Sequence, residues 1–306
     1  MEKKKKRKFG DRRDGVWLKD ESAIHGIMPY IYPNRADNEA YIQECIELEP
    51  VNAYIDKKNE ELRKKVESGE LPESALEDPY KMFQVILAAL VKTMTLRPKL
   101  NRFIAGKKLF QKNVLSLGFV VKKKFEDNGA EALAFKEFGP ETTMDIVHKK
   151  IVDEINFCRS ENETDNSTDF MEKFMKLPPF IMRPLMAIIR RLDYHGLVPY
   201  SLVKTDPDYA SCFITNLGSI GLRSGYHHLS NWGTTSFFVI LGEKKWKPFY
   251  DRDGNVKMKE VIDIGLTIDE RIADGYYYAK SVKLFKYLLA NPELLDERAD
   301  EQVDYK

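Results

Sequence analysis

The sequence predicts a protein of the α/β class, because helix-like and strand-like segments follow one another along the chain. Residues 80–96 carry apolar side chains at helical spacing, which predicts an amphipathic helix packed against a sheet. The segments 103–110 and 114–122 are rich in apolar and β-branched residues and predict two strands joined by a tight turn. Apolar residues make up 43% of the 306 residues, which is enough for a substantial core.

Before residue 80 the pattern is weaker. The stretch 41–48 alternates in polarity and fits either a strand or a short helix. Residues 59–68 are charged and helix-prone. The Gly, Pro, Glu and Ser residues of 69–79 predict an exposed loop.

The middle of the chain predicts a strand over 130–137 and a helix over 141–157, whose apolar residues form one stripe. The polar, acidic segment 159–169 predicts a surface loop. A further helix is expected over 178–191, ending near His195, which a glycine follows. A cation and a glycine at that place are typical of a helix C-terminus, so we interpret His195 as a cap.

The last third is rich in predicted strands, over residues 211–215, 236–242, 246–250 and 256–267. The pair Asp253-Gly254 predicts a hairpin turn between the last two strands. A long helix over 273–289 closes the pattern. We expect a single domain over 16–297, between a basic N-terminal arm, 1–15, and an acidic tail, 298–306.

The composition argues against several classes of partner. Lys and Arg total 49 against 48 Asp and Glu, so the chain has no general attraction to nucleic acid or to an anionic membrane. No apolar run reaches the roughly 20 residues that cross a bilayer. Cys45, Cys158 and Cys212 are too few and too widely spaced for a disulfide framework or a thiolate metal site. We therefore expect a cytoplasmic protein with no metal, no nucleic acid and no membrane contact.

Three segments, in this order, resemble motifs of the chloramphenicol acetyltransferase and 2-oxoacid dehydrogenase acyltransferase superfamily. The first is Arg-Pro-Lys-Leu-Asn-Arg-Phe at 97–103, which joins the predicted helix to a strand. The second is Cys-Phe-Ile-Thr-Asn-Leu-Gly at 212–218. The third is Leu-Thr-Ile-Asp-Glu-Arg-Ile-Ala-Asp-Gly at 266–275, followed by a helix and Pro-Glu-Leu-Leu at 292–295. Their order and their strand-turn-helix context make the resemblance specific.

The resemblance implies a two-layer, chloramphenicol acetyltransferase-like fold with a mixed β-sheet backed by helices. It also implies a homotrimer whose sites lie between subunits and transfer an acyl group from a coenzyme A thioester to a thiol or hydroxyl. Coenzyme A is then a co-substrate, and no cofactor is bound covalently. The chain contains no recognisable lipoyl or subunit-binding domain.

The resemblance also implies roles for individual residues. Thr215 corresponds to the hydroxyl that stabilises the oxyanion, and Asp274 corresponds to the orienting acid. Glu270 stands where the family has its catalytic histidine. Candidate substrate-binding residues are Asn216, Asn101 and Arg102, of which Arg102 could meet a phosphate of coenzyme A.

A carboxylate is a much weaker base than an imidazole, although burial can strengthen it. His227 and His228 lie in the loop that leads to the predicted strand 236–242, and either of them could supply the base that Glu270 does not. The alternative is that both are turn or interface histidines. Glu270 could likewise be a polar interface residue, beside an ion pair of Arg271 with Asp274.

Two functions follow from this pattern. The first is a coenzyme A-dependent acyltransferase that acts on a small thiol or hydroxyl acceptor. The second is a catalytically inactive trimeric scaffold or ligand-binding relative.

Overall fold

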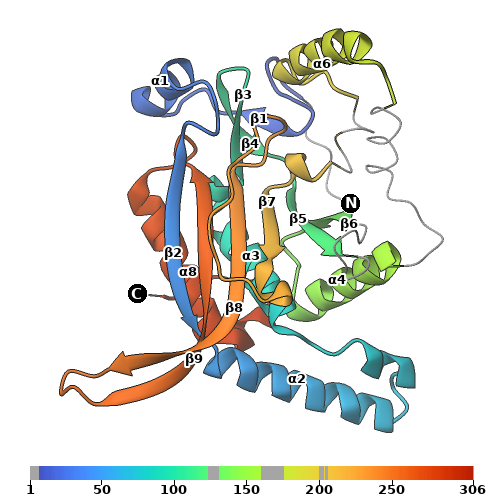
Figure 1. Cartoon of the computed structure of the whole chain (residues 1–306), viewed down its shortest axis with the longest axis vertical. Coiled ribbons are helices and arrows are strands. Elements are labelled where there is room, and N and C mark those ends of the chain that lie inside the picture. Colours follow the sequence, from blue (N-terminus) through green and yellow to red (C-terminus); the bar gives the residue numbers. More distant parts are fainter. Residues whose placement is uncertain (1–6, 123–130, 160–175, 200–202, 204–205, 306) are drawn as a thin grey trace.

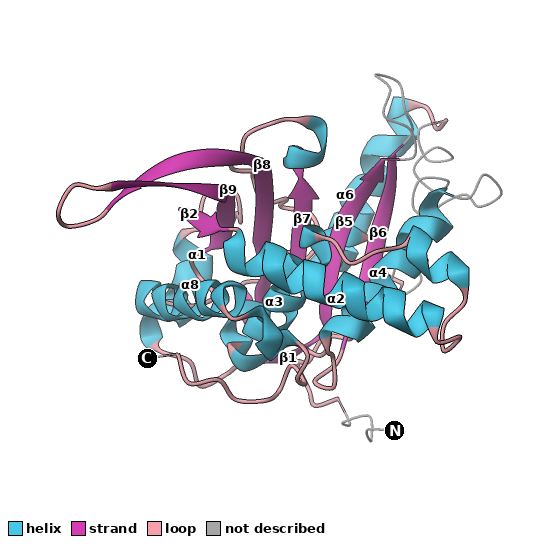
Figure 2. Cartoon of the chain, turned by 90° about the horizontal axis from the view of Figure 1, so that it is seen from below, coloured by secondary structure: helices cyan, strands magenta, loops and turns pink. Residues whose placement is uncertain are grey.

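The computed structural model describes residues 7–122, 131–159, 176–199, 203 and 206–305. A six-stranded sheet forms one layer, and helices cover one of its faces (Figures 1 and 2). The strand order is β2 (Glu39–Glu47), β9 (Val256–Asp269), β8 (Phe237–Tyr250), β7 (Cys212–Asn216), β5 (Leu115–Lys122) and β6 (Glu131–Phe138). β7 runs parallel to both β5 and β8, and the other pairs are antiparallel. The predicted mixed sheet backed by helices is confirmed.

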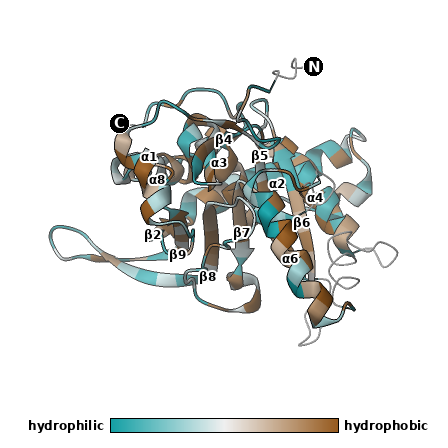
Figure 3. Ribbon diagram, turned by 90° about the horizontal axis from the view of Figure 1, so that it is seen from above, coloured by the Kyte–Doolittle hydropathy of each residue, from teal (hydrophilic) through white to brown (hydrophobic). Residues whose placement is uncertain are grey.

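The helical layer is built around α3 (Met82–Leu96), the segment with the clearest helical pattern. α2 (Glu49–Glu67), α4 (Met144–Arg159) and α8 (Gly275–Ala290) contact it. Every residue from Gln84 to Met94 is buried, so α3 is central rather than amphipathic. Even Lys92 is covered, and its Nζ donates to the carbonyls of Leu294 and Arg298 at 2.8 and 2.9 Å. Figure 3 shows the hydrophobic residues gathered on the central strands and on α3.

A second, three-stranded sheet was not predicted. It consists of β1 (Gly15–Trp17), β4 (Lys108–Lys112) and β3 (Arg102–Ala105). The single strand expected over 103–110 is therefore wrong, because Gly106 and Lys107 turn the chain back on itself. Both have positive φ, 54° and 58°, as two-residue hairpin loops prefer. β5, expected to pair with this segment, belongs to the large sheet instead.

The strands expected over 236–242 and 246–250 are one continuous strand, β8. A bulge lies between Leu241 and Lys244, and beyond it β8 and β9 leave the body as a long hairpin (Figure 1). The polar residues at 243–245 broke the sequence pattern because this part of the strand leaves the core. The turn at its tip is as predicted, since Asp251 accepts from the amides of Asp253 and Asn255.

The other predicted elements are present with shifted ends. The ambiguous stretch 41–48 is strand β2, and the helix expected over 59–68 begins ten residues earlier, at Glu49. α6 (Pro179–Tyr194) ends at His195, its C-cap, and Gly196 has a φ of 68°. The short helix α1 (Ala23–Ile31) was not predicted. Apart from Arg159, the loop expected over 159–169 lies outside the described residues.

Both ends of the described chain contact the body. Arg12 is buried and pairs with Asp14 at 2.9 Å and with Asp193 at 3.3 Å. At the other end Ala299 is buried, and Tyr305 packs against the core. None of the three cysteines forms a disulfide. No helix of the described residues is long and apolar enough to cross a membrane, and these residues form no cluster suited to a metal ion.

The loop 221–235 covers the sheet face opposite the helices. Leu229 packs there on Phe238 and Ile240, with Phe213 at the edge of the cluster. The loop backbone comes so close that a Cβ on Gly265 would overlap the carbonyl oxygen of Gly225. A glycine is required at position 265 for this reason.

We expect Gly265→Ala to lower the free energy of unfolding by about 1–3 kcal/mol, because the methyl group must displace the loop. Urea denaturation would measure the loss. Gly275→Ala is the matched control: no atom lies within 4 Å of the added Cβ, so its stability should equal or slightly exceed that of the wild type. Equal stability of wild type and Gly265→Ala would contradict the close packing of the loop.

Candidate functional site

Thr215 and Glu270 lie far apart within one chain. Thr215 pairs with Ile240 on β8, and Ile240 pairs with Gly265 on β9. Glu270 is five residues further along, and five residues of strand span about 17 Å. Two strand spacings add to this separation. The two side chains therefore do not meet in one small site within a single chain.

Asp274 has a definite local role. It is the N-cap of α8, and its Oδ1 accepts from the amide of Tyr277 at 2.9 Å. That hydrogen bond lowers the pKa of the exposed Asp274 carboxyl. Glu270 is also exposed, and its amide donates to the carbonyl of Asn38 at 2.9 Å. Neither carboxylate pairs with Arg271, so the ion pair considered between Arg271 and Asp274 is not formed.

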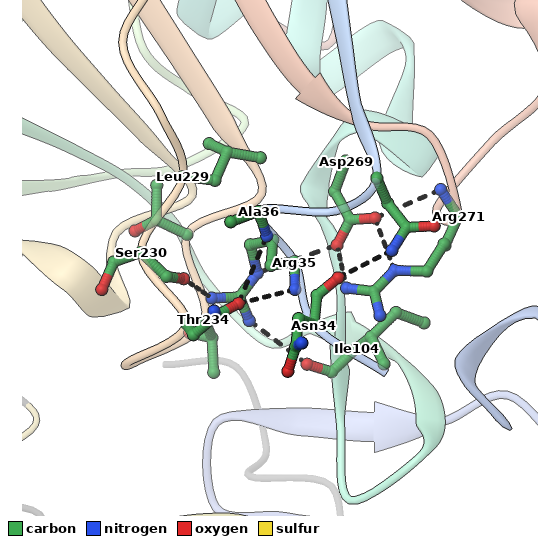
Figure 4. A network of polar contacts seen from close by, with 12 residues as sticks. Asn34, Arg35, Ala36, Ile104, Leu229, Ser230, Thr234, Asp269 and Arg271 are labelled. Carbon is green, nitrogen blue, oxygen red and sulfur yellow. Dashed lines mark hydrogen bonds and ion pairs between the residues drawn. The ribbon is translucent and has the colours of Figure 1, made fainter. Parts of the chain in front are cut away.

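The partner of Arg271 is Asp269, in a contact the sequence did not single out. Nε and Nη2 of Arg271 donate to the two carboxylate oxygens of Asp269 at 2.7 and 2.6 Å. Arg35 approaches the same carboxylate, with its Nε 3.7 Å from Oδ2. Figure 4 shows the two guanidinium groups on either side of Asp269. We call these three residues the buried charge cluster, since none is more than 5% exposed.

Backbone carbonyls complete the cluster. Arg35 donates to the carbonyls of Ser230, Trp232, Gly233 and Ile104. Arg271 Nη1 donates to those of Tyr32 and Pro33 at 2.9 and 3.2 Å. The cluster therefore ties the end of β9 to the segment between α1 and β2, to the β3–β4 hairpin and to the loop 221–235.

His227 is held in a defined orientation. Its ring stacks on Phe238, with centroids 4.4 Å apart and 7° between the planes. Its Nδ1 lies 2.8 Å from the carbonyl oxygen of His228. A carbonyl can only accept, so Nδ1 carries the proton and Nε2 keeps its lone pair. The ring is exposed, and in this tautomer Nε2 can accept a proton. His228 stacks on the outside of His227, 4.6 Å away.

Thr215 lies on the same sheet face as this histidine. Phe213 packs in the cluster on that face, next to Phe238, and side chains two residues apart on a strand share a face. Thr215 is thus about 7 Å along β7 from Phe213. Phe213 lies next to Phe238, the ring on which His227 stacks. The structure brings Thr215 and His227 to one surface.

The three predicted substrate-binding residues are not gathered at one place. Arg102 is buried on β3 and pairs with Glu21 at 2.8 Å. Asn101 is also buried, and its Nδ2 donates to the carbonyl of Val114 at 3.3 Å. Asn216 ends β7, on the other sheet, where its carbonyl accepts from Ser219.

A cavity of about 440 Å³ opens beside the buried charge cluster. Its walls are the segments 33–35, 104–107 and 231–233, together with Arg271 and the end of α6. The residues of this cavity were not predicted, because they come from five separated parts of the chain.

Comparisons with known proteins agree with this architecture. Residues 201–296 match the family described as 2-oxoacid dehydrogenases acyltransferase (catalytic domain). A search of curated proteins gives no match.

Three solved structures resemble the whole chain. A probable dihydrolipoamide acetyltransferase from Listeria monocytogenes 4b F2365 is 14% identical, with a TM-score of 0.55, over 94% of this chain and 98% of that chain. The cubic core of the pyruvate dehydrogenase multienzyme complex is 13% identical, with a TM-score of 0.50, over 91% and 94%. A chloramphenicol acetyltransferase is 12% identical, with a TM-score of 0.50, over 90% and 98%.

At such identities the likeness concerns the fold, which covers nearly the whole of each chain. The chain has the chloramphenicol acetyltransferase-like fold, and its residues 201–296 carry the match to the catalytic domain of the 2-oxoacid dehydrogenase acyltransferase family.

Proposed function

We propose that the protein transfers an acyl group from a coenzyme A thioester to a small thiol or hydroxyl acceptor, with His227 as the general base. The observation that carries this proposal is the hydrogen bond from Nδ1 of His227 to the carbonyl of His228, which leaves Nε2 free to accept a proton. The match of residues 201–296 to an acyltransferase family supports the reaction class.

The proposed reaction begins with a proton transfer to His227. Nε2 of His227 takes the proton of the acceptor thiol or hydroxyl, and the acceptor attacks the thioester carbonyl. The Thr215 hydroxyl donates to the oxyanion that forms. When the carbon–sulfur bond breaks, the coenzyme A thiolate leaves and takes the proton back from the imidazolium.

A second subunit completes this site. The distance between Thr215 and Glu270 within one chain supports an assembly in which Glu270 comes from a neighbour, where its carboxylate stabilises the imidazolium. We propose a homotrimer in the cytoplasm, in line with the family resemblance. Sedimentation of the purified protein tests the assembly, and a monomer would contradict the shared site.

The two adjacent histidines provide a matched pair of variants for the kinetic test. With acetyl-CoA and a small thiol, His227→Ala should lower kcat/KM by about 100-fold, as loss of a general base does. His228→Ala should stay close to wild type, because its ring only covers that of His227. Chromatographic separation of free coenzyme A from acetyl-CoA measures both rates. Equal rates for His227→Ala and wild type would overturn the assignment of the base.

The second candidate function is an inactive ligand-binding trimer. It is favoured by Asp274, whose carboxylate caps α8 instead of orienting a catalytic group, and by Glu270 in place of histidine. If the wild type releases no coenzyme A and Glu270→His creates that activity, this candidate replaces the first.

A further inference from the structure

We propose that the cavity beside the buried charge cluster binds a small organic molecule through a carboxylate or phosphate group. This proposal does not depend on acyl transfer. The volume of about 440 Å³ is in the range of small-molecule sites in proteins.

The charge of the walls indicates an anion. Four lining side chains are basic, Arg35, Lys107, Arg190 and Arg271, and only Asp193 is acidic. Asp193 is already engaged, because it pairs with Arg12 and accepts from the hydroxyl of Tyr209 at 2.7 Å. Its charge is therefore shared with a cation outside the cavity.

The innermost wall carries more positive than negative charge. Arg35 and Arg271 are both buried, and the one carboxylate between them is Asp269. Arg271 has five N–H donors. Four of them are assigned: Nε and one on Nη2 to Asp269, and two on Nη1 to carbonyls. One N–H of Nη2 has no acceptor among the described residues. An oxyanion in the cavity would accept this N–H and balance the second guanidinium.

The rim adds two exposed cations. Lys107 and Arg190 are exposed, and neither forms an ion pair with a carboxylate in the part of the chain that the structure describes. Nζ of Lys107 lies over the face of the Tyr30 ring, 5.2 Å from its centroid. Lys107 belongs to the β3–β4 turn and Arg190 to α6. Because they lie on different walls, one anion can be bound from two sides.

The backbone at this rim is specialised. Lys107 has a φ of 58°, a conformation that side chains other than Asn and Asp rarely adopt. Gly106 beside it packs on the end of α6, where a Cβ would overlap the carbonyl oxygen of Tyr194. This conformation belongs to the β3–β4 hairpin loop, and the contact at Gly106 holds the loop against α6. Here it fixes the lysine at the mouth of the cavity.

Isothermal titration calorimetry tests the proposal, with inorganic phosphate and with succinate as separate probes at constant ionic strength. We expect saturable binding of at least one probe. Binding of phosphate alone would assign a phosphate-bearing ligand, and binding of succinate alone a carboxylate-bearing one. Saturable binding of neither probe would overturn the proposal.

Variants locate the site. Arg190→Gln and Lys107→Asn should each raise the Kd about fivefold or more, because each removes a charge-assisted contact. Asparagine tolerates the left-handed conformation, so Lys107→Asn keeps the turn. Arg183→Gln is the matched control, since Arg183 is an exposed arginine of α6 that does not line the cavity. If Arg183→Gln weakens binding as much as Arg190→Gln, the anion binds the surface at large and the proposal fails.

Discussion

Replacing Asp269 by Asn should lower the free energy of unfolding by about 3–5 kcal/mol, the typical result of removing one partner from a buried ion pair. Asp269 is fully buried and accepts two charge-assisted hydrogen bonds from Arg271. It also faces Arg35. Burial lowers the pKa of Arg35, and the negative charge of Asp269 opposes that shift. Without the carboxylate, two buried guanidinium groups face each other uncompensated. Urea denaturation followed by circular dichroism would measure the loss.

The neighbouring carboxylate provides the control. Glu270→Gln removes the same charge one residue further on, but at an exposed position, so its stability should remain near that of the wild type. If Asp269→Asn and Glu270→Gln lowered the free energy of unfolding by similar amounts, the net charge of the segment would matter and not the buried charge cluster.

We expect the stability to increase with pH between about 7 and 10, because of Lys112. Its Nζ is buried and donates to the carbonyls of Tyr209 and Ala210 and to the Thr234 hydroxyl at 2.5, 2.9 and 2.8 Å. Burial lowers the pKa of Lys112 to about 7. In the unfolded chain a lysine keeps its proton up to about pH 10.4. Between these values the unfolded state binds more protons, so stability rises with pH, by at most about 1.4 kcal/mol per pH unit.

Lys112→Met isolates this effect, because it removes the titrating group and keeps the length of the side chain. Unfolding free energies of the two proteins would be measured across the same pH range. The difference between them should grow in favour of the wild type from pH 7 to 10. Parallel curves would mean that the three oxygen acceptors keep Lys112 charged throughout.

Local patterns predicted the helices other than α1 and most strands of the large sheet. The pattern of residues 80–96 depends only on nearby residues, and the helix formed there. The strand expected over 103–110 failed because Gly-Lys is an unusual hairpin loop, and apolar residues on both sides of it concealed the turn. The small sheet also includes β1, which the short segment 15–17 gave no reason to expect.

The candidate site was harder to predict than the fold. The motif drew attention to Glu270 and Asp274, the two exposed carboxylates of the segment, whereas the buried Asp269 makes the ionic contacts. The carboxylate of Asp269 is buried beside Arg35, which is distant in the sequence. No local pattern reveals that partner. The tautomer of His227 depends on the backbone of its neighbour and was equally hidden.

The bulge in β8 inserts one extra residue into that strand relative to β9. Between the pairs Leu241–Ile264 and Lys244–Ile262, two residues of β8, Gly242 and Glu243, stand opposite one residue of β9, Asp263. Beyond this point Trp246, Pro248 and Tyr250 therefore share one face of the hairpin, and the lysines at 245 and 247 share the other with Asp263. Deleting one residue at the bulge would restore a regular ladder and keep Lys244 opposite Ile262. Deleting one residue from each strand nearer the tip would shorten the hairpin and keep its register. Related sequences should therefore vary in the length of this hairpin by pairs of residues.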